Sequence, residues 1–154
     1  MEDDAALIIA LTMMFAVIPL SGGLALWLIL RARRKSDAPP SREMDGTVTF
    51  PVRGLLRGGR FLGYSKNNLS ARFAVAPDGL RFKIFRFDHW PFAEIAQVDA
   101  PWNPFSTRIA FHARSGATLF VDVAGEARGR ELLRLLPAGL VLTPRALALR
   151  DSGP

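Results

Sequence analysis

Cysteine is absent from the 154 residues of the chain, and histidine occurs only twice. The missing cysteines exclude a disulfide framework, a thiolate metal site and a cysteine nucleophile. The sequence also contains no GxSxG, P-loop or HExxH motif and no carboxylates paired at helical spacing. We therefore predict that the protein is not an enzyme and that it has no catalytic residue, no metal ligand and no cofactor.

Charged residues are absent from residues 5–30, AALIIALTMMFAVIPLSGGLALWLIL. About 20 apolar residues cross the hydrocarbon core of a bilayer as a helix, so this run predicts a transmembrane helix. A cleaved secretory signal is the alternative, but it would need a basic start and a shorter apolar core. The acidic start MEDD, residues 1–4, favours an uncleaved anchor with an extracytoplasmic N-terminus.

A basic cluster, RARRK, follows the apolar run directly. Its charged residues are Arg31, Arg33, Arg34 and Lys35. Basic residues beside a membrane span stay on the cytoplasmic side. We therefore predict a single-pass protein of the inner (plasma) membrane, with the N-terminus outside and the rest of the chain cytoplasmic. The cluster can also attract anionic lipid headgroups, so a plain topology anchor and lipid recognition both remain open.

The formal net charge is +6, from 20 basic and 14 acidic residues, and such a balance favours anionic surroundings. Outside the basic cluster, however, the basic residues are interspersed with acidic ones. No recognition helix or base-stacking motif is found in the sequence. We therefore predict contact with membrane lipids and no nucleic-acid partner.

The remainder of the chain begins with a polar segment that contains two prolines, so residues 31–45 are predicted as a basic juxtamembrane segment and linker. From residue 46 onward, apolar and polar residues alternate in short runs separated by turn residues. Strands are predicted near 48–52, 60–65, 69–76, 79–85, 91–98, 109–113 and 119–123, with a glycine-rich break at 54–59. Pro77-Asp78-Gly79 predicts a hairpin turn in which Gly79 takes a left-handed conformation.

The stretch FDHWPFAEIAQV, residues 87–98, places a histidine beside an aspartate and a tryptophan, which suggests a site. On a strand, however, neighbouring side chains point to opposite faces, so Asp88 and His89 are not expected to share a ligand. The alternation also fails within this stretch, which predicts a bulge with Ile95 and Val98 in the core. We interpret the stretch as scaffold, with His89 near solvent.

After residue 123 the apolar period changes to that of a helix, with Leu132, Leu133 and Leu136 on one face. Glu126 suits the first turn, and Pro137 is expected to end the helix. Residues 138–154 are predicted as a C-terminal tail that adds a strand and then frays.

The order of these elements resembles that of the bacterial pleckstrin-homology-like (PH-like) domains over residues 46–137. The runs that carry the resemblance are RFAVAPDGLRFKIF, WPFAEIAQVDA, TRIAFHARSGATLFVDV and RELLRLLP. The resemblance implies a mainly β fold, a seven-stranded antiparallel barrel or sandwich capped by one C-terminal α-helix. It also implies a role in binding and assembly rather than catalysis. Eukaryotic relatives bind lipid through basic residues of the first hairpin loop, where this chain has Arg53, Arg57 and Arg60.

Two functional hypotheses follow. In the first, the domain docks a partner protein or membrane complex, or forms a homo-oligomer, through the loop DAPWNPFS, residues 99–106. Its candidate residues are Trp102, Asn103 and Phe105, because exposed aromatic side chains in loops mark interfaces. The alternative for both rings is that they fill the open end of the barrel. In the second hypothesis, the arginines of the first hairpin loop and the basic cluster hold the domain against anionic headgroups.

Overall fold

The computed structural model describes residues 38–59, 63–67 and 71–153. The predicted transmembrane helix and the basic cluster that follows it lie outside these residues. Within the described ranges, no helix is long and apolar enough to cross a membrane. The chain divides into two units, Met1–Lys35 and Ser36–Pro154, and the second unit is the one described below.

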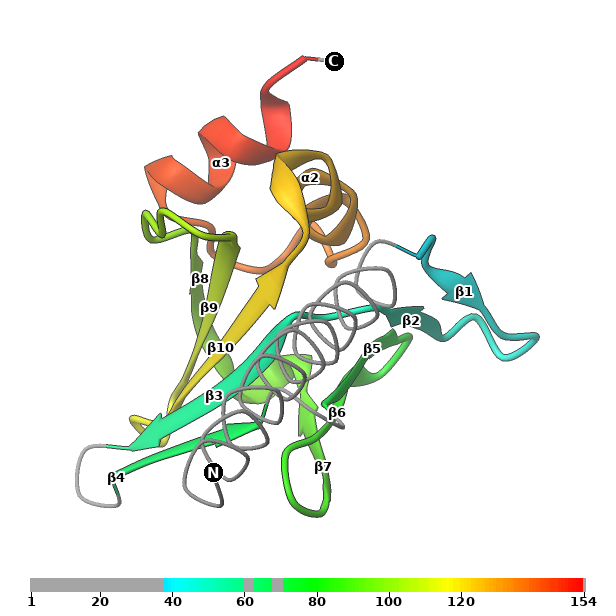
Figure 1. The fold of residues 1–154 in the computed structure, drawn as a ribbon, viewed down its shortest axis with the longest axis vertical. Coiled ribbons are helices and arrows are strands. Elements are labelled where there is room, and N and C mark those ends of the chain that lie inside the picture. The colour runs from blue at the N-terminus through cyan, green and yellow to red at the C-terminus, as the bar shows by residue number, and fades with distance from the viewer. Residues whose placement is uncertain (1–37, 60–62, 68–70, 154) are drawn as a thin grey trace, which may run out of the picture. The chain divides into compact units, whose positions relative to one another are not determined.

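The described part of the chain consists of ten strands, two α-helices and one short 3-10 helix (Figure 1). The strands are β1 (Ser41–Arg42), β2 (Val48–Phe50), β3 (Gly54–Gly59), β4 (Gly63–Asn67), β5 (Arg72–Ala76), β6 (Gly79–Lys83), β7 (Phe87–Pro91), β8 (Ile95–Asp99), β9 (Thr107–Ala113) and β10 (Thr118–Val123). The helices are the 3-10 helix η1 (Phe92–Glu94) and the α-helices α2 (Gly125–Arg134) and α3 (Pro144–Asp151).

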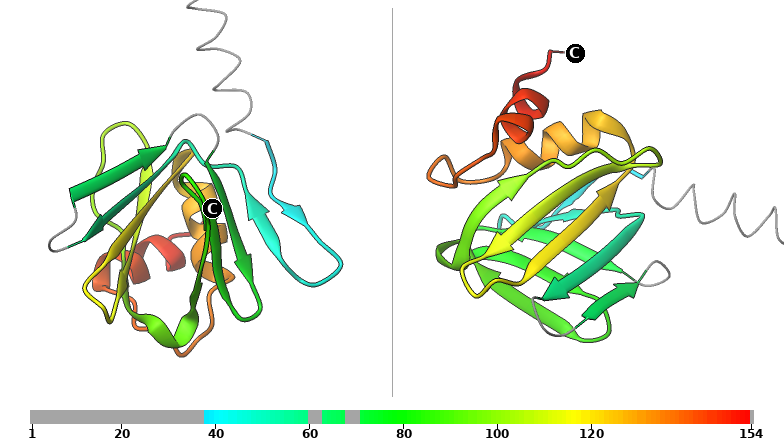
Figure 2. Two further views of the ribbon diagram at one scale, coloured as in Figure 1. Left: turned by 90° about the horizontal axis from the view of Figure 1, so that it is seen from below. Right: turned by 90° about the vertical axis from the view of Figure 1, so that its left-hand side faces the viewer.

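The strands form two five-stranded sheets, which pack as two layers with the helices at one end (Figure 2). Sheet A has the order β1-β2-β5-β6-β7, and sheet B has the order β4-β3-β10-β9-β8. All strand pairs within both sheets are antiparallel. The prediction of a mainly β, antiparallel fold is therefore confirmed. Of the two predicted arrangements, the two packed sheets agree with the sandwich and not with a closed barrel. The predicted number of seven strands is wrong for the described residues, which form ten.

One segment that passes between the sheets is residues 48–59. Its first part, β2, pairs with β5 in sheet A, and its second part, β3, pairs with β10 in sheet B. Pro51 lies between the two strands, where its missing N–H costs no ladder hydrogen bond. The glycine-rich break predicted at 54–59 is wrong, because these residues form β3. Glycine weakens a strand without preventing its backbone from pairing.

The stretch FDHWPFAEIAQV also passes from one sheet to the other. It was expected to contain one strand, but the structure shows β7 in sheet A, the turn η1, and β8 in sheet B. The predicted bulge is confirmed as a shift of register between Ile95 and Gln97. Ile95 and Val98 are buried as predicted, and His89 is exposed.

The turn between β5 and β6 differs from the prediction in one respect. The predicted hairpin forms, with Ala76 paired to Gly79, but Gly79 does not have a positive φ. The position requires glycine for another reason. A Cβ atom there would lie 2.3 Å from the carbonyl oxygen of Trp90 and 2.8 Å from the Cα of Pro91. The absent side chain therefore permits the close approach of β7.

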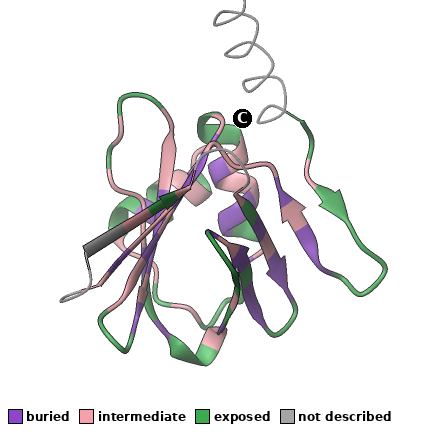
Figure 3. Cartoon of the chain, turned by 60° about the horizontal axis from the view of Figure 1, so that its bottom comes forward, coloured by how far each residue is buried: buried purple, intermediate pink, exposed green. Residues whose placement is uncertain are grey.

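The core lies between the two sheets, where the alternating apolar residues of both meet (Figure 3). The rings of Phe73 in β5 and Phe111 in β9 join the layers, with centroids 5.9 Å apart. Within sheet A, Phe82 and Trp90 pack edge to face at 5.5 Å. The predicted inward residues of β6, Leu80 and Phe82, are both buried.

The two α-helices cover one end of the sheets. The leucine face predicted for the first of them is confirmed, since Leu132, Leu133 and Leu136 all belong to the core cluster. The prediction of only one C-terminal helix is wrong, because part of the tail forms α3. Thr143 caps α3 by accepting a hydrogen bond from the Ala146 N–H, and proline follows it at the first helical position.

The segments that flank the domain also pair with it. The tail reaches sheet B through a parallel bridge between Leu142 and Val98, which is the short strand contact that the tail was expected to add. At the other end, the predicted linker is not wholly extended, because β1 pairs with β2 around a turn at Gly46, where φ is 83°. Asp45 accepts hydrogen bonds from the Thr47 N–H and hydroxyl, and these lower the pKa of its carboxyl.

We expect Gly79→Ala to lower the free energy of unfolding by about 1–3 kcal/mol, since the added methyl group collides with the backbone of β7. Urea denaturation of a 36–154 fragment measures the effect. Gly139→Ala is the matched control, because a Cβ at that position meets no atom within 4 Å. Equal unfolding midpoints for the two variants would contradict the close approach described here.

Candidate functional site

The loop between β8 and β9 carries two aromatic side chains that point away from the core. Trp102 is 81% exposed and Phe105 is 85% exposed. Neither ring therefore fills the space between the sheets, which was the alternative for this loop. The two rings leave a large apolar surface in solvent, and such surfaces are typical of interaction sites.

Hydrogen bonds within the loop hold its shape. The side chain of Asn103 accepts from the Phe105 N–H at 3.2 Å and donates to the Ser106 hydroxyl at 2.9 Å. Arg53, the residue before β3, donates to the carbonyl oxygen of Phe105 at 3.2 Å. Asn103, predicted as a binding residue, therefore supports the loop that presents the two rings.

An ion pair between two side chains lies beneath the loop. Arg108 of β9 donates two hydrogen bonds to Asp122 of β10, at 2.7 and 2.8 Å. The carboxylate raises the pKa of the Arg108 guanidinium by accepting these bonds. Asn103 Nδ2 lies 3.5 Å from the same carboxylate, so the loop is linked to the sheet. Because the two charges neutralise each other, the base of the loop has little net charge.

A hollow of about 410 Å³ adjoins the loop. Its lining includes Trp102 and Arg108 from sheet B and its loop, Glu126 from α2, and Arg145 and Leu149 from α3. The loop, α2 and α3 thus meet at the same end of the domain (Figure 1). The resulting surface has an apolar centre and a rim that carries both signs of charge.

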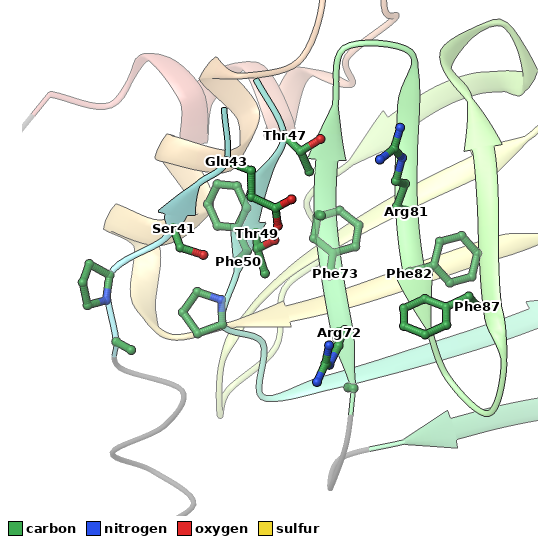
Figure 4. Close-up of a pocket in the computed structure, with 15 residues that line it drawn as sticks. Ser41, Glu43, Thr47, Thr49, Phe50, Arg72, Phe73, Arg81, Phe82 and Phe87 are labelled. Carbon is green, nitrogen blue, oxygen red and sulfur yellow. Dashed lines mark hydrogen bonds between the residues drawn. The ribbon is translucent and has the colours of Figure 1, made fainter. Parts of the chain in front are cut away.

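A larger hollow of about 550 Å³ lies on the outer face of sheet A (Figure 4). Thr49, Ala74 and Arg81 occupy successive strands in register and line it. Its depth arises because Ala74, in the middle of this row, has a small side chain. Arg81 lies 3.7 Å from Asp45 and 3.5 Å from Asp78, so two carboxylates share its charge.

The two histidines have separate partners. His89 Nε2 lies 3.4 Å from an oxygen of Asp78, whereas its neighbour Asp88 contacts Arg57 at 2.5 Å. The side chains of Asp88 and His89 therefore contact different partners, although Asp88 also accepts a hydrogen bond from the His89 N–H at 2.9 Å. His112 pairs with the Thr118 hydroxyl at 3.0 Å. Throughout the described ranges, no three His, Asp or Glu side chains gather as metal ligands would.

Two of the predicted lipid-binding arginines, Arg53 and Arg57, lie among the described residues, and both make contacts within the domain. Arg57 lies on β3 rather than in a loop, and its guanidinium contacts Asp88 and lies 5.4 Å from the centre of the Trp90 ring. Arg53 supports the aromatic loop. The remaining candidates lie outside the described residues: Arg31, Arg33, Arg34, Lys35 and Arg60.

Sequence reasoning missed a second exposed aromatic pair, Phe85 and Phe87, in the turn between β6 and β7. The sequence contained a signal for this pair. Phe85 and Phe87 continue the alternate positions that begin with Arg81 and Lys83, whose side chains were expected to point outward.

Comparison with known proteins gave no family model and no curated protein that matches the chain. The class of the domain therefore rests on its architecture. It is a mainly β domain of two antiparallel sheets, with two helices at the end where its aromatic loop lies.

We expect Asn103→Ala to loosen the aromatic loop, because the Phe105 N–H loses its acceptor. Hydrogen exchange of that amide should become roughly fivefold faster, as for the loss of about 1 kcal/mol. Ser106→Ala is the control, since it leaves the acceptor in place. An unchanged exchange rate in Asn103→Ala would show that this bond does not order the loop.

Proposed function

We propose that the protein is a membrane-anchored binding and assembly module whose aromatic loop docks a partner protein or membrane complex at the inner face of a bacterial membrane. The observation that carries the proposal is the exposure of Trp102 and Phe105 on a loop that hydrogen bonds hold in place. Aromatic side chains supply much of the binding energy of protein interfaces. A loop already ordered before binding loses little conformational entropy when it binds.

The surroundings of the two rings also favour a protein partner. Glu126 and Arg145 lie beside the hollow at the loop, and the Arg108–Asp122 pair lies beneath it. An apolar centre with a polar rim of mixed charge is the usual composition of a protein–protein interface. The partner would supply a pocket for the rings and polar groups for the rim. A second copy of the chain is one such partner.

A PH-like classification of the domain is part of the proposal. Its support is the crossing of residues 48–59 from sheet A to sheet B and the cover that α2 gives to the end of the sheets. The helix α3 and the strand β1 are additions to the pattern that the resemblance implied. Anchoring by residues 5–30, with the domain in the cytoplasm, rests on the apolar run and the basic cluster.

The alternative function is lipid binding by the first hairpin. The contacts that the arginines of this hairpin make favour lipid binding less than partner docking. Arg57 is paired with Asp88 and Arg53 donates to the carbonyl of Phe105, so headgroups would compete with contacts inside the domain. The basic cluster RARRK can still attract anionic lipid beside the predicted anchor.

The proposal predicts that Trp102→Ala/Phe105→Ala will weaken partner binding by at least about 30-fold, the effect of removing one interface hot spot. The measurement is crosslinking in native membranes followed by affinity capture of the full chain in mild detergent. Captured proteins are compared quantitatively between the variant and the unaltered chain.

Phe85→Ala/Phe87→Ala is the matched control, because it removes an equally exposed aromatic pair from another turn. It should retain the partner. Capture of every partner by the Trp102/Phe105 variant would exclude the loop as the interface. Two differently tagged copies, expressed together, identify the case in which the partner is the chain itself.

A further inference from the structure

The turn between β6 and β7 presents the second exposed aromatic pair of the domain. Phe85 is 75% exposed and Phe87 is 68% exposed. The turn lies at the end of the sheets opposite the helices and the aromatic loop (Figure 1). Neither exposed ring is needed for the core, which Phe82 and Ile84 of the same hairpin supply.

The turn is fixed to the domain on both sides. Ile84 is buried, and its carbonyl oxygen accepts a hydrogen bond from the side-chain amide of Asn67 in β4. Lys83 and Phe87 are paired across the hairpin, and the Lys83 ammonium lies 5.2 Å from the centre of the Phe87 ring. The backbone therefore holds the two rings at the tip, where they cannot fold back onto the core.

Basic side chains lie beside the rings. Lys83 contacts the Phe87 ring, Arg86 lies between the two phenylalanines in the turn, and Arg72 of β5 lines the same hollow as Phe87. Lys66 of β4 precedes Asn67, whose side chain binds the hairpin at Ile84. Arg72 and Lys83 face each other across neighbouring strands. Within the part of the chain that the structure describes, none of the four forms an ion pair. The nearest carboxylate in the sequence, Asp88, is already paired with Arg57 at 2.5 Å.

We propose that this cationic aromatic tip, residues 83–87 with Lys66 and Arg72, binds the surface of an anionic bilayer. Aromatic rings on a basic element settle at the boundary between headgroups and acyl chains, while the cations remain among the headgroups. Residues 83–87 contain two basic side chains and no acidic one, which distinguishes this tip from the mixed-charge rim of the aromatic loop. The inference goes beyond the proposed docking function and does not depend on it.

The shape of the tip favours a bilayer over nucleic acid. A protein that binds single-stranded nucleic acid tracks the backbone along a positively charged groove and stacks bases on aromatic faces. Here Phe85 lies at the projecting end of a hairpin and lines neither of the hollows described above, whereas Phe87 and Arg72 contribute to the lining of the hollow on sheet A. A projecting turn with apolar ends suits insertion into an interface.

The geometry has a consequence for the whole domain. The tip and the aromatic loop lie at opposite ends of the sheets (Figure 1). A domain seated on the bilayer through the tip would therefore direct the aromatic loop away from the membrane. The two exposed aromatic pairs would then act on different partners at the same time.

The test uses vesicle flotation of a 36–154 fragment, which contains the entire buried core of the described residues. The vesicles consist of phosphatidylcholine alone or with about one-third phosphatidylglycerol. The fragment should float only with the anionic vesicles. Lys83→Gln/Arg86→Gln should lower the partition constant roughly 25-fold, since each basic residue near an anionic surface contributes about fivefold. Phe85→Ser/Phe87→Ser should lower it by at least about tenfold.

Two matched controls separate the tip from the rest of the surface. Trp102→Ser/Phe105→Ser removes an exposed aromatic pair, and Arg42→Gln/Arg145→Gln removes two exposed charges, all outside the tip. Both should float like the unaltered fragment, and all variants should keep its unfolding midpoint. Equal loss in tip and control variants would overturn the proposal. Flotation without anionic dependence, or binding of a single-stranded oligonucleotide in place of vesicles, would also overturn it.

The full chain allows a second measurement, because it contains no cysteine and a single thiol can be introduced for labelling. An environment-sensitive dye is attached at Phe85→Cys or, as the control at the helix end, at Gly139→Cys. In nanodiscs with anionic lipid, the emission at position 85 should shift to the blue, whereas that at position 139 should not. Identical spectra at the two positions would contradict contact between the tip and the bilayer.

Discussion

The burial of two apolar sheet faces against each other is the constraint on which the rest of the structure depends. Phe73 and Phe111 mark the contact between the sheets, with ring centroids 5.9 Å apart, and the side chains around them belong to both layers. Residues 48–59 contribute strands to each sheet, so the chain itself ties the layers together. With the inner faces occupied, the surfaces left for recognition are the outer faces and the loops at the two ends.

The polar contacts between the sheets position these ends more than they stabilise the fold. The Arg57–Asp88 pair joins β3 to β7, but both side chains are more than a third exposed, so it contributes little to the free energy of unfolding. Its effect is geometric, because it fixes β7 just after the basic turn. In the same way, the hydrogen bond from Arg53 to Phe105 fixes the aromatic loop against the start of β3. Arg53 and Arg57, which the resemblance suggested for lipid binding, thus make contacts within the domain.

Alternation of apolar residues predicted which side chains point inward, and it did so correctly for Leu80, Phe82 and the leucines of α2. It could not predict the sheet to which a strand belongs. Alternation shows which side chains lie on the same face of a strand, but not which other strand pairs with it. The single strand expected within FDHWPFAEIAQV therefore became two. For the site, the sequence placed Trp102 in a proline-containing loop but left open whether its ring is exposed or fills the end of the barrel, and only the structure shows that it is exposed. The support from Arg53 could not be predicted, since its partner lies 52 residues away.

The two exposed aromatic pairs show how one type of side chain acquires two recognition chemistries from its neighbours. Around Trp102 and Phe105, the cation Arg108 is paired with a carboxylate and other charges of both signs form the rim, so desolvation by a folded partner costs little. Around Phe85 and Phe87, the cations Lys66, Arg72, Lys83 and Arg86 form no ion pair among the described residues, and the neighbouring carboxylate Asp88 is paired with Arg57. Burying such cations in a protein interface would be costly without matching anions, whereas an anionic bilayer supplies those anions and keeps the cations hydrated. The arrangement of charge, rather than the rings themselves, therefore distinguishes the two ends of the domain.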